Sequence, residues 1–234
     1  MMQRGKMLAV LLIGCWWGSA PGRALGDERH FVLIFGAQPK PKVIRYSHTW
    51  ATFVRVVDDP AAPGGAQLFA HTLSFYPATL DVRPLALRAE PGVNLDLDTT
   101  LALMRQNNAG VTAWGPFPMR PQVYQKSVEV WTQFSSGIVD YRAIDTFNRN
   151  VDDCIHAVTA VDPDYGRGHY PLTRVGKSAS RYIARQVVKR IDPDRQMPDQ
   201  AWLIAALGLD RPEVEVILPS QLPIRRGILA PRGD

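Results

Sequence analysis

The sequence predicts an α+β fold in which an antiparallel sheet packs on helices. The first half of the chain contains apolar and alternating segments with many β-branched and aromatic residues, a pattern typical of strands. The second half contains segments in which apolar residues recur at the spacing of a helix. Neither an internal repeat nor a linker divides the sequence, so we expect one domain behind an N-terminal leader.

Three segments in the first half are expected to form strands. Residues 30–36 are a continuous apolar run that ends at a glycine, which indicates a buried strand. Residues 47–57 alternate, and residues 67–76 follow them after a turn rich in proline and glycine. These two segments predict a β-hairpin. Further strands are expected over residues 84–89, 111–117, 138–144 and 214–218.

Five segments are expected to form helices. Residues 94–108 predict a helix capped by Asn94 or Asp96. Residues 121–136 predict an amphipathic helix with a proline in its first turn. The apolar face of that helix is expected to contain Tyr124, Val128 and Trp131. The remaining helices are expected over residues 154–161, 177–190 and 200–207.

Residues 1–26 have the pattern of an export signal, with a basic start, an apolar core over 7–17 and a small-residue end. The apolar core is shorter than the about 20 residues that a membrane-spanning helix needs. We therefore expect an exported protein of the periplasm or cell envelope whose mature chain begins at Asp27. The alternative is a lipobox at residues 12–15, in which Cys15 is lipidated and anchors the protein to a membrane surface.

The charge of the chain does not indicate a nucleic-acid partner. The formal net charge is +5, and the leader carries Arg4, Lys6 and Arg23 without any acid, which leaves only +2 for the rest. We expect a single domain over residues 27–210, followed by a Pro/Arg-rich tail over residues 211–234.

Cys154 is the residue with the most distinctive chemistry. The chain has two cysteines, so removal of a leader that contains Cys15 leaves Cys154 without an intramolecular partner. It follows Asp152 and Asp153 and opens the expected helix over 154–161, where exposed N–H groups and the helix dipole favour a thiolate. We interpret Cys154 as a candidate nucleophile, and the alternative is a buried, inert thiol.

A nucleophilic thiol needs an imidazole as base and a group that orients the imidazole. His48 opens the strand over 47–57, which places it to project toward a helix N-terminus. His156 lies two residues after Cys154, about 200° around the helix axis, so a packing or capping role is expected for it. His48 is therefore the candidate base.

The predicted hairpin register suggests which groups surround this base. If Val57 pairs with Gln67, His48 faces Tyr76, and His71 lies farther along the strand. Ser74 then lies nearer to His48 than His71 does, although a bulge in the connection would change this. The orienting group is thus His71 or Ser74.

A histidine that opens a strand, a second strand with a polar group and then a cysteine that opens a helix resembles the circularly permuted papain-like (NlpC-type) superfamily. The superfamily includes lecithin-retinol-acyltransferase-like proteins and exported bacterial relatives. The resemblance lies in the segments Tyr46-Ser-His-Thr-Trp-Ala-Thr-Phe and Asp152-Asp-Cys-Ile-His-Ala. The second segment is similar to the Asn-Cys-x-His-Phe motif of the acyltransferases.

This resemblance implies a permuted papain-like arrangement in which Cys154 is the nucleophile, His48 the base and His71 the third residue. Tyr141, thirteen residues before Cys154, is similar to a tyrosine that precedes the cysteine in the exported relatives. Asp153 departs from the pattern because it stands in place of an asparagine. A carboxylate beside the thiol opposes the formation of a thiolate.

We therefore expect an exported thiol hydrolase or acyltransferase that acts on an amide or ester of the cell envelope. Its substrate would be a peptidoglycan peptide or a lipid-linked acyl group, and no cofactor is expected. The competing hypothesis is a non-catalytic binding or structural protein of the envelope on the same scaffold. A zinc site is not expected, because Cys154 and His156 have an atypical spacing and point apart on a helix.

Overall fold

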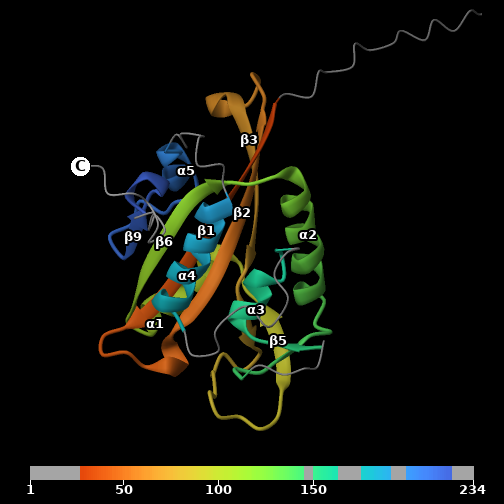
Figure 1. The fold of residues 1–234 in the computed structure, drawn as a ribbon, viewed down its shortest axis with the longest axis vertical. Helices are drawn as coiled ribbons and strands as arrows, with labels where there is room; N and C mark the ends of the chain where they lie inside the picture. Colours follow the sequence, from red (N-terminus) through yellow and green to blue (C-terminus); the bar gives the residue numbers. More distant parts are fainter. Residues whose placement is uncertain (1–26, 145–149, 163–174, 191–198, 223–234) are drawn as a thin grey trace, which may run out of the picture.

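The computed structural model describes residues 27–144, 150–162, 175–190 and 199–222. The leader with Cys15 and the end of the expected tail lie outside the described residues. The chain forms the predicted α+β fold, with two mainly antiparallel sheets and helices packed against them (Figure 1). Among the described residues, no helix is both long and apolar enough to cross a bilayer.

Two sheets organise the fold. The large sheet has the spatial order β3 (Ala66–Leu73), β2 (His48–Asp58), β1 (Glu28–Pro39), β6 (Ala109–Pro118) and β9 (Val214–Ile217). The small sheet has the order β4 (Phe75–Pro77), β5 (Glu90–Asn94), β7 (Asp140–Tyr141) and β8 (Val151–Asp152). All neighbouring strands are antiparallel except the parallel pairs β6–β9 and β7–β8.

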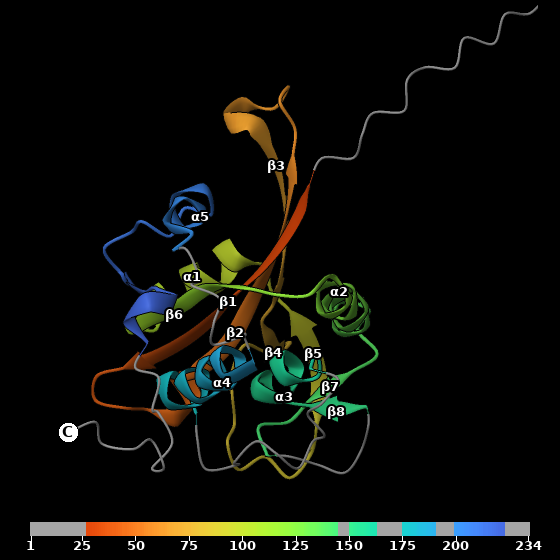
Figure 2. The ribbon, with the colours of Figure 1, turned by 45° about the horizontal axis from the view of Figure 1, so that its top comes forward.

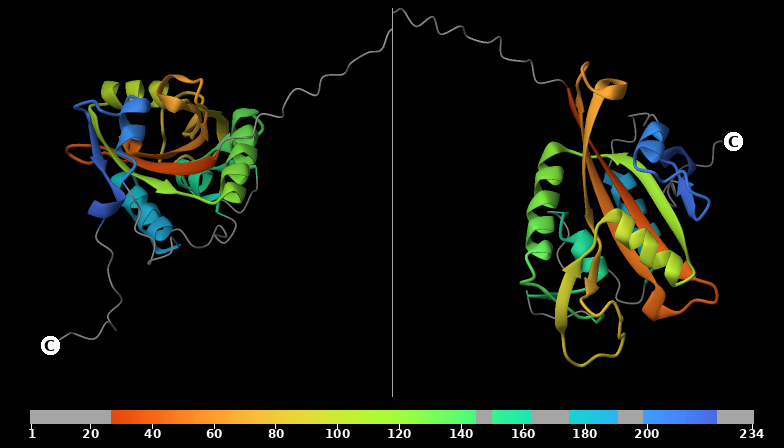
Figure 3. Two further views of the ribbon diagram at one scale, coloured as in Figure 1. Left: turned by 90° about the horizontal axis from the view of Figure 1, so that it is seen from above. Right: turned by 180° about the vertical axis from the view of Figure 1, so that it is seen from behind.

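Helices cover both faces of the large sheet. They are α1 (Leu97–Gln106), α2 (Pro121–Ser135), α3 (Cys154–Thr159), α4 (Lys177–Arg190) and α5 (Ala201–Ala206). The helices α3 and α4 lie side by side (Figure 2), and α1 covers the opposite face (Figure 3). The helix α2 packs along β3 and β5.

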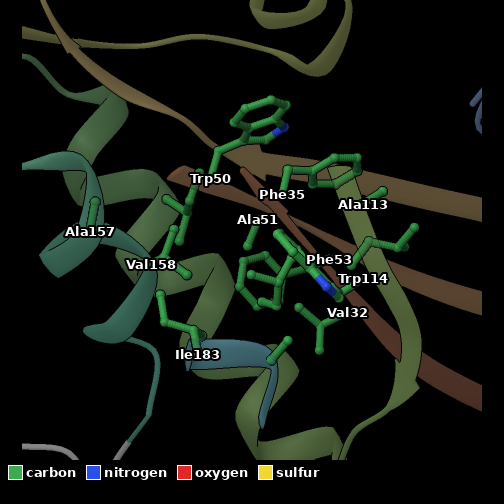
Figure 4. Packing of buried hydrophobic residues seen from close by; sticks show 14 of the residues in the cluster. Val32, Phe35, Trp50, Ala51, Phe53, Ala113, Trp114, Ala157, Val158 and Ile183 are labelled. Carbon is green, nitrogen blue, oxygen red and sulfur yellow. The ribbon is translucent and has the colours of Figure 1, made fainter. Parts of the chain in front are cut away.

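The central strand β1 explains why its sequence is apolar without alternation. Its neighbours are β2 and β6, and α4 packs on one of its faces. The side chains of both faces are buried from Phe31 to Ala37, which is typical of a strand that is covered on both sides. On one side of the sheet, Phe35 stacks on Trp50 with ring centroids 5.0 Å apart (Figure 4). On the other side, Ala51 faces Val158 of α3 (Figure 4).

The predicted hairpin is confirmed. Val57 pairs with Gln67, which is the register that places His48 opposite Tyr76 without a bulge in the connection. The second strand of the hairpin, however, does not run through to residue 76. It ends at Leu73, and the chain enters the small sheet as β4 after Ser74.

The strand predicted over 84–89 is wrong. The segment turns instead, because the N–H of Ala86 donates to the carbonyl of Arg83 across Pro84. The strand β5 begins at Glu90, where a Glu-Pro-Gly turn would be expected. A Cβ on Gly92 would lie 2.0 Å from the ring of Phe75, so glycine is needed here for the close packing of two strands.

The predicted apolar face of α2 is wrong in part, because only Tyr124 of its three residues is half-buried and packs against the core. Val128 and Trp131 are each 38% exposed, whereas Ser127, Val130 and Phe134 are buried. Relative to the prediction, the helix is rotated so that Ser127 faces the sheet. The hydroxyl of Ser127 pairs there with Nε2 of His71 in β3 at 2.9 Å. A polar residue on the buried face is invisible to a hydropathy pattern.

The C-terminal part of the fold extends beyond residue 210. The strand β9 lies within the segment 211–234 that we expected to be a tail, and it pairs with β6 at the edge of the large sheet. The described residues continue to Leu222, which is buried in the core.

Gly36 is the point where β1 and α4 approach most closely. A Cβ there would lie 2.2 Å from Ser180 Oγ and 2.8 Å from the Cα of Lys177. Gly36→Ala is therefore expected to lower the free energy of unfolding by about 1–3 kcal/mol, measured by urea denaturation. Gly110→Ala is the matched control, because its Cβ would meet only Lys177 Nζ at 3.8 Å. Equal midpoints for the two variants would contradict this account of the packing.

Candidate active site

The candidate site lies where the chain passes from β3 to β4. The last pair between β2 and β3 is Ala51 with Leu73, so β3 no longer borders the beginning of β2. Asn94 bridges the break: its Oδ1 accepts from the N–H of Ser74 at 2.8 Å, and its Nδ2 donates to the Thr72 carbonyl at 2.9 Å. The side chain of Asn94 thus replaces main-chain bonds that a continuous strand would make.

His48 is the first residue of β2 and is only 1% exposed. Its Nε2 lies 2.9 Å from Ser74 Oγ, to which the hydroxyl of Thr100 also donates at 2.8 Å. The ring packs against Tyr76, with ring centroids 3.9 Å apart, and Trp50 stacks on it at 5.5 Å. The predicted contact with Tyr76 is present, and Ser74 is the polar residue on the imidazole.

Burial determines the protonation of this histidine. Desolvation lowers the pKa of His48 to about 3, so the imidazole is neutral at physiological pH. The neutral ring has two tautomers. With the proton on Nε2, the ring donates to Ser74 Oγ, and Nδ1 keeps the lone pair that a base requires.

Cys154 is the first residue of α3, and Asp153 is the cap of that helix. Asp153 Oδ1 accepts from the N–H groups of Ile155 at 2.7 Å and His156 at 3.0 Å. The main-chain N–H groups of Thr49, Cys154 and Ile155 are close enough to the sulfur to lower the pKa of the thiol, and α3 packs against β2. The thiol therefore lies at the beginning of β2, against the residue that follows His48.

The predicted thiolate is not favoured in this environment. Desolvation and, to a smaller extent, the neighbouring carboxylate of Asp153 raise the pKa of the Cys154 thiol to about 12. The three N–H groups lower the pKa but do not offset these effects. Among the described residues, no hydrogen bond joins the thiol to the imidazole of His48, so the structure holds two neutral groups on adjacent parts of the fold.

Two buried tyrosines lie close enough to the half-buried thiol to feel its charge. Burial raises the pKa of both Tyr76 and Tyr141 well above the usual range, and a charge on Cys154 would raise both further. The hydroxyl of Tyr76 points to Met104 Sδ at 3.9 Å. The sequence carries a signal for Tyr141 through its distance from Cys154, but none for Tyr76 as a wall of the site.

His71 does not take part in this arrangement. It lies opposite Phe53 on β2, and its Nε2 is 2.9 Å from Ser127 Oγ of α2. Burial lowers its pKa to about 4. Of the two residues proposed to orient the imidazole of His48, the structure therefore brings Ser74 to it and not His71.

His156 has the packing and capping role expected for it. Its Nδ1 lies 2.7 Å from Oδ2 of Asp153, and both side chains are buried. This pair fixes the first turn of α3, which has only six residues. Within the described part of the chain, no group of three or more His, Cys, Asp and Glu side chains is arranged to hold a metal ion.

Two groups of the site were not predicted as site residues. The contribution of Thr49 is its main-chain N–H, which no side-chain pattern reveals. Thr100 lies one turn after the cap of α1, Asp96, and its hydroxyl is 2.6 Å from the carbonyl of that residue and 2.8 Å from Ser74 Oγ. Comparison with protein-family models, with curated proteins and with solved structures found no match.

The buried neutral His48 predicts a loss of stability in acid. Its pKa is about 3 in the folded protein against 6.5 normally, so the unfolded chain binds an additional proton between these values. The contribution is fully present above pH 6.5 and decreases as the pH falls toward 3. Between about pH 4 and pH 6, His48→Gln is expected to reduce the slope of unfolding free energy against pH by about 1.4 kcal/mol per unit.

The measurement is denaturant unfolding of both proteins at several pH values in this range. Glutamine can retain a hydrogen bond to Ser74 Oγ without titrating, which makes it a conservative replacement. Identical slopes for the two proteins would show that His48 is not a neutral buried group.

The carboxylate of Asp153 predicts a test of the thiol itself. In a Cys15→Ser background, Cys154 is the only thiol of the chain. Asp153→Asn keeps an oxygen that can cap α3 but removes the charge that raises the pKa of Cys154. Alkylation by iodoacetamide at about pH 8 is expected to become several-fold faster, measured by mass spectrometry.

Asp140→Asn is the matched control, because it removes an exposed acid of the small sheet. It should leave the alkylation rate unchanged. A rate increase of the same size in both variants would mean that overall charge, rather than the neighbouring carboxylate, controls the thiol.

Proposed function

We propose that this protein is a thiol hydrolase or acyltransferase with Cys154 as nucleophile and His48 as base. The observation that carries the proposal is the packing of α3 against β2, where the main-chain N–H of Thr49 is close enough to the sulfur to lower the pKa of the thiol. Cys154, which opens α3, thereby lies beside Thr49, the residue of β2 that follows His48. The order of a histidine strand before a cysteine helix supports a permuted papain-like arrangement of these elements.

The reaction begins with two neutral groups. The sulfur forms a bond to the carbonyl carbon of an amide or ester while its proton passes to Nδ1 of His48. The bond to the amine or alcohol then breaks, and the imidazole returns the proton to this leaving group. A thioester remains on Cys154. Water releases the acyl group in a hydrolase, and a second alcohol or amine accepts it in an acyltransferase.

Main-chain donors beside the sulfur can stabilise the oxyanion that forms during attack. The N–H groups of Thr49 and Cys154 both lie near the sulfur and lower the pKa of the thiol. Donors of this kind typically contribute about 3–4 kcal/mol to transition-state stabilisation. They compensate in part for the high pKa of the thiol, because they act on the charge after it has moved to oxygen.

Ser74 and Thr100 are positioning residues in this scheme. The hydroxyl of Ser74 holds Nε2 of His48, and Thr100 holds the hydroxyl of Ser74. A fixed ring loses less conformational freedom when it receives the proton. The scheme uses the tautomer in which Nε2 donates to Ser74 Oγ and Nδ1 is the base.

The substrate class follows from the leader and not from the site. An export signal directs the protein to the envelope, where peptidoglycan peptides supply amides and lipid-linked acyl groups supply esters. Both contain the carbonyl group that a thiol attacks.

A second candidate function is a non-catalytic binding or structural protein of the envelope on the same scaffold. The observation that favours it is the protonation of the resting site. Burial disfavours both the thiolate of Cys154 and the imidazolium of His48, so no ion pair is formed before a substrate binds.

An activated ester separates the two functions. In the Cys15→Ser background, a p-nitrophenyl ester is expected to acylate Cys154, and mass spectrometry locates the thioester. His48→Gln should slow acylation about a hundredfold or more, because general base catalysis contributes about 10²–10⁴ in rate. Cys154→Ser should abolish the thioester.

His71→Gln is the matched control, because His71 is a half-buried histidine of the same hairpin that does not contact the site. It should acylate at the wild-type rate. Equal rates in folded His48→Gln and in the control, or no thioester at all, would favour the non-catalytic scaffold.

A further inference from the structure

The loop between β4 and β5 presents two leucines to solvent. Leu85 and Leu87 are 85% and 87% exposed, the highest values among the exposed large apolar side chains of the described residues. A leucine gains free energy when it leaves water, so two such residues in one short loop are unfavourable unless something covers them.

The main chain of this loop is held by specific contacts. The N–H of Ala86 donates to the carbonyl of Arg83 at 3.1 Å, which closes the turn that carries Leu85. Arg142 Nε donates to the carbonyl of Ala86 at 3.2 Å, between the two leucines. The leucines are therefore presented by a defined turn that is attached to the segment after β7.

A second apolar segment lies beside this loop. The short helix η1 (Ile44–Tyr46) has Ile44 53% exposed, and Arg45 of this helix forms an ion pair with Asp81 of the loop. Leu80, next to Asp81, is 43% exposed. Both segments lie at the end of the molecule opposite the tip of the β2–β3 hairpin (Figures 1 and 3).

The charge around these residues is mainly positive. The segments 40–46 and 78–89 contain a single acid, Asp81, followed by Glu90 at the start of β5. Their cations are Lys40, Lys42, Arg45, Arg83 and Arg88, all exposed. We call this end of the molecule, formed by residues 40–46 and 78–89, the leucine surface.

Aliphatic side chains surrounded by lysine and arginine match a bilayer with anionic headgroups. The apolar groups enter the region below the headgroups, and the cations remain at the phosphates. A protein interface has a different composition, because its centre is enriched in aromatic residues and depleted of lysine. The leucine surface has only Tyr46 as an exposed aromatic residue.

We infer that the leucine surface docks on an anionic lipid bilayer, with Leu85 and Leu87 inserted. The docking does not require lipidation of Cys15 or catalysis by Cys154. The leucine surface adjoins the thiol site, because Arg142, which holds Ala86, follows Tyr141 at the wall of that site. A lipid-linked substrate of the proposed enzyme would therefore be close to Cys154 when the protein is docked.

Flotation of the full chain with vesicles tests the docking. The probes are vesicles of phosphatidylcholine alone and vesicles that also contain phosphatidylglycerol. The double variant Leu85→Ser with Leu87→Ser is expected to lose affinity for the anionic vesicles by about tenfold or more. Arg83→Gln with Arg88→Gln should weaken binding to the anionic vesicles only.

The matched control is Leu68→Ser with Phe69→Ser, which removes two exposed apolar side chains of β3, away from the leucine surface. The leader is the same in every protein, so it contributes equally to binding. All variants change exposed side chains, and thermal unfolding verifies that they fold. Equal affinities of the leucine variant and the control would overturn the inference.

Hydrogen exchange supplies a local readout that binding through the leader does not change. Amides of residues 85–88 should exchange several-fold more slowly with anionic vesicles, and amides of residues 67–70 should not. Binding without this protection would overturn the inference. The acylation assay contains no lipid, so failure of docking and failure of the proposed catalysis remain separate results.

Discussion

At Ser74 the chain leaves the large sheet for the small one, and this transfer leaves main-chain groups without a strand partner. Asn94 satisfies them with its side-chain amide, while the N–H of Leu95 donates to the Ser74 carbonyl at 2.9 Å. Because β3 departs here, the beginning of β2 is open to other groups. The hydroxyl of Ser74 and the sulfur of Cys154 both lie near the beginning of β2. The break in the strand therefore creates the site.

Close packing around the break also sets the chemistry. The ring of His48 lies between Tyr76 and Trp50, which removes it from water, and the same environment desolvates the thiol. Both groups are therefore held in their neutral forms. An enzyme that begins from this state must move a proton and form a bond in the same step, and its substrate must displace little water to reach the sulfur.

The features of this structure that depend on a local sequence pattern could be predicted, and those that depend on residues distant in sequence could not. The alternation over 47–57 and the proline-glycine turn are local, so the hairpin and its register were predictable. The break at Ser74 was not, because a serine in an alternating strand has the pattern of a solvent-facing residue. For the same reason, the sequence pattern did not indicate that Ser127 lies on the buried face of α2. The proximity of Cys154 to β2 was expected from a resemblance, but its high pKa depends on desolvation by residues distant in sequence.

Asp153 shows how stability and reactivity oppose each other at this site. Its carboxylate caps a helix of only six residues and pairs with His156, so it stabilises the position of Cys154. The same negative charge raises the pKa of the adjacent thiol. Asparagine would cap the helix with less electrostatic penalty to a thiolate but would lose the contact between the carboxylate and His156 Nδ1. With aspartate at this position, a catalytic role requires that stabilisation of the oxyanion, rather than of the thiolate, lowers the barrier.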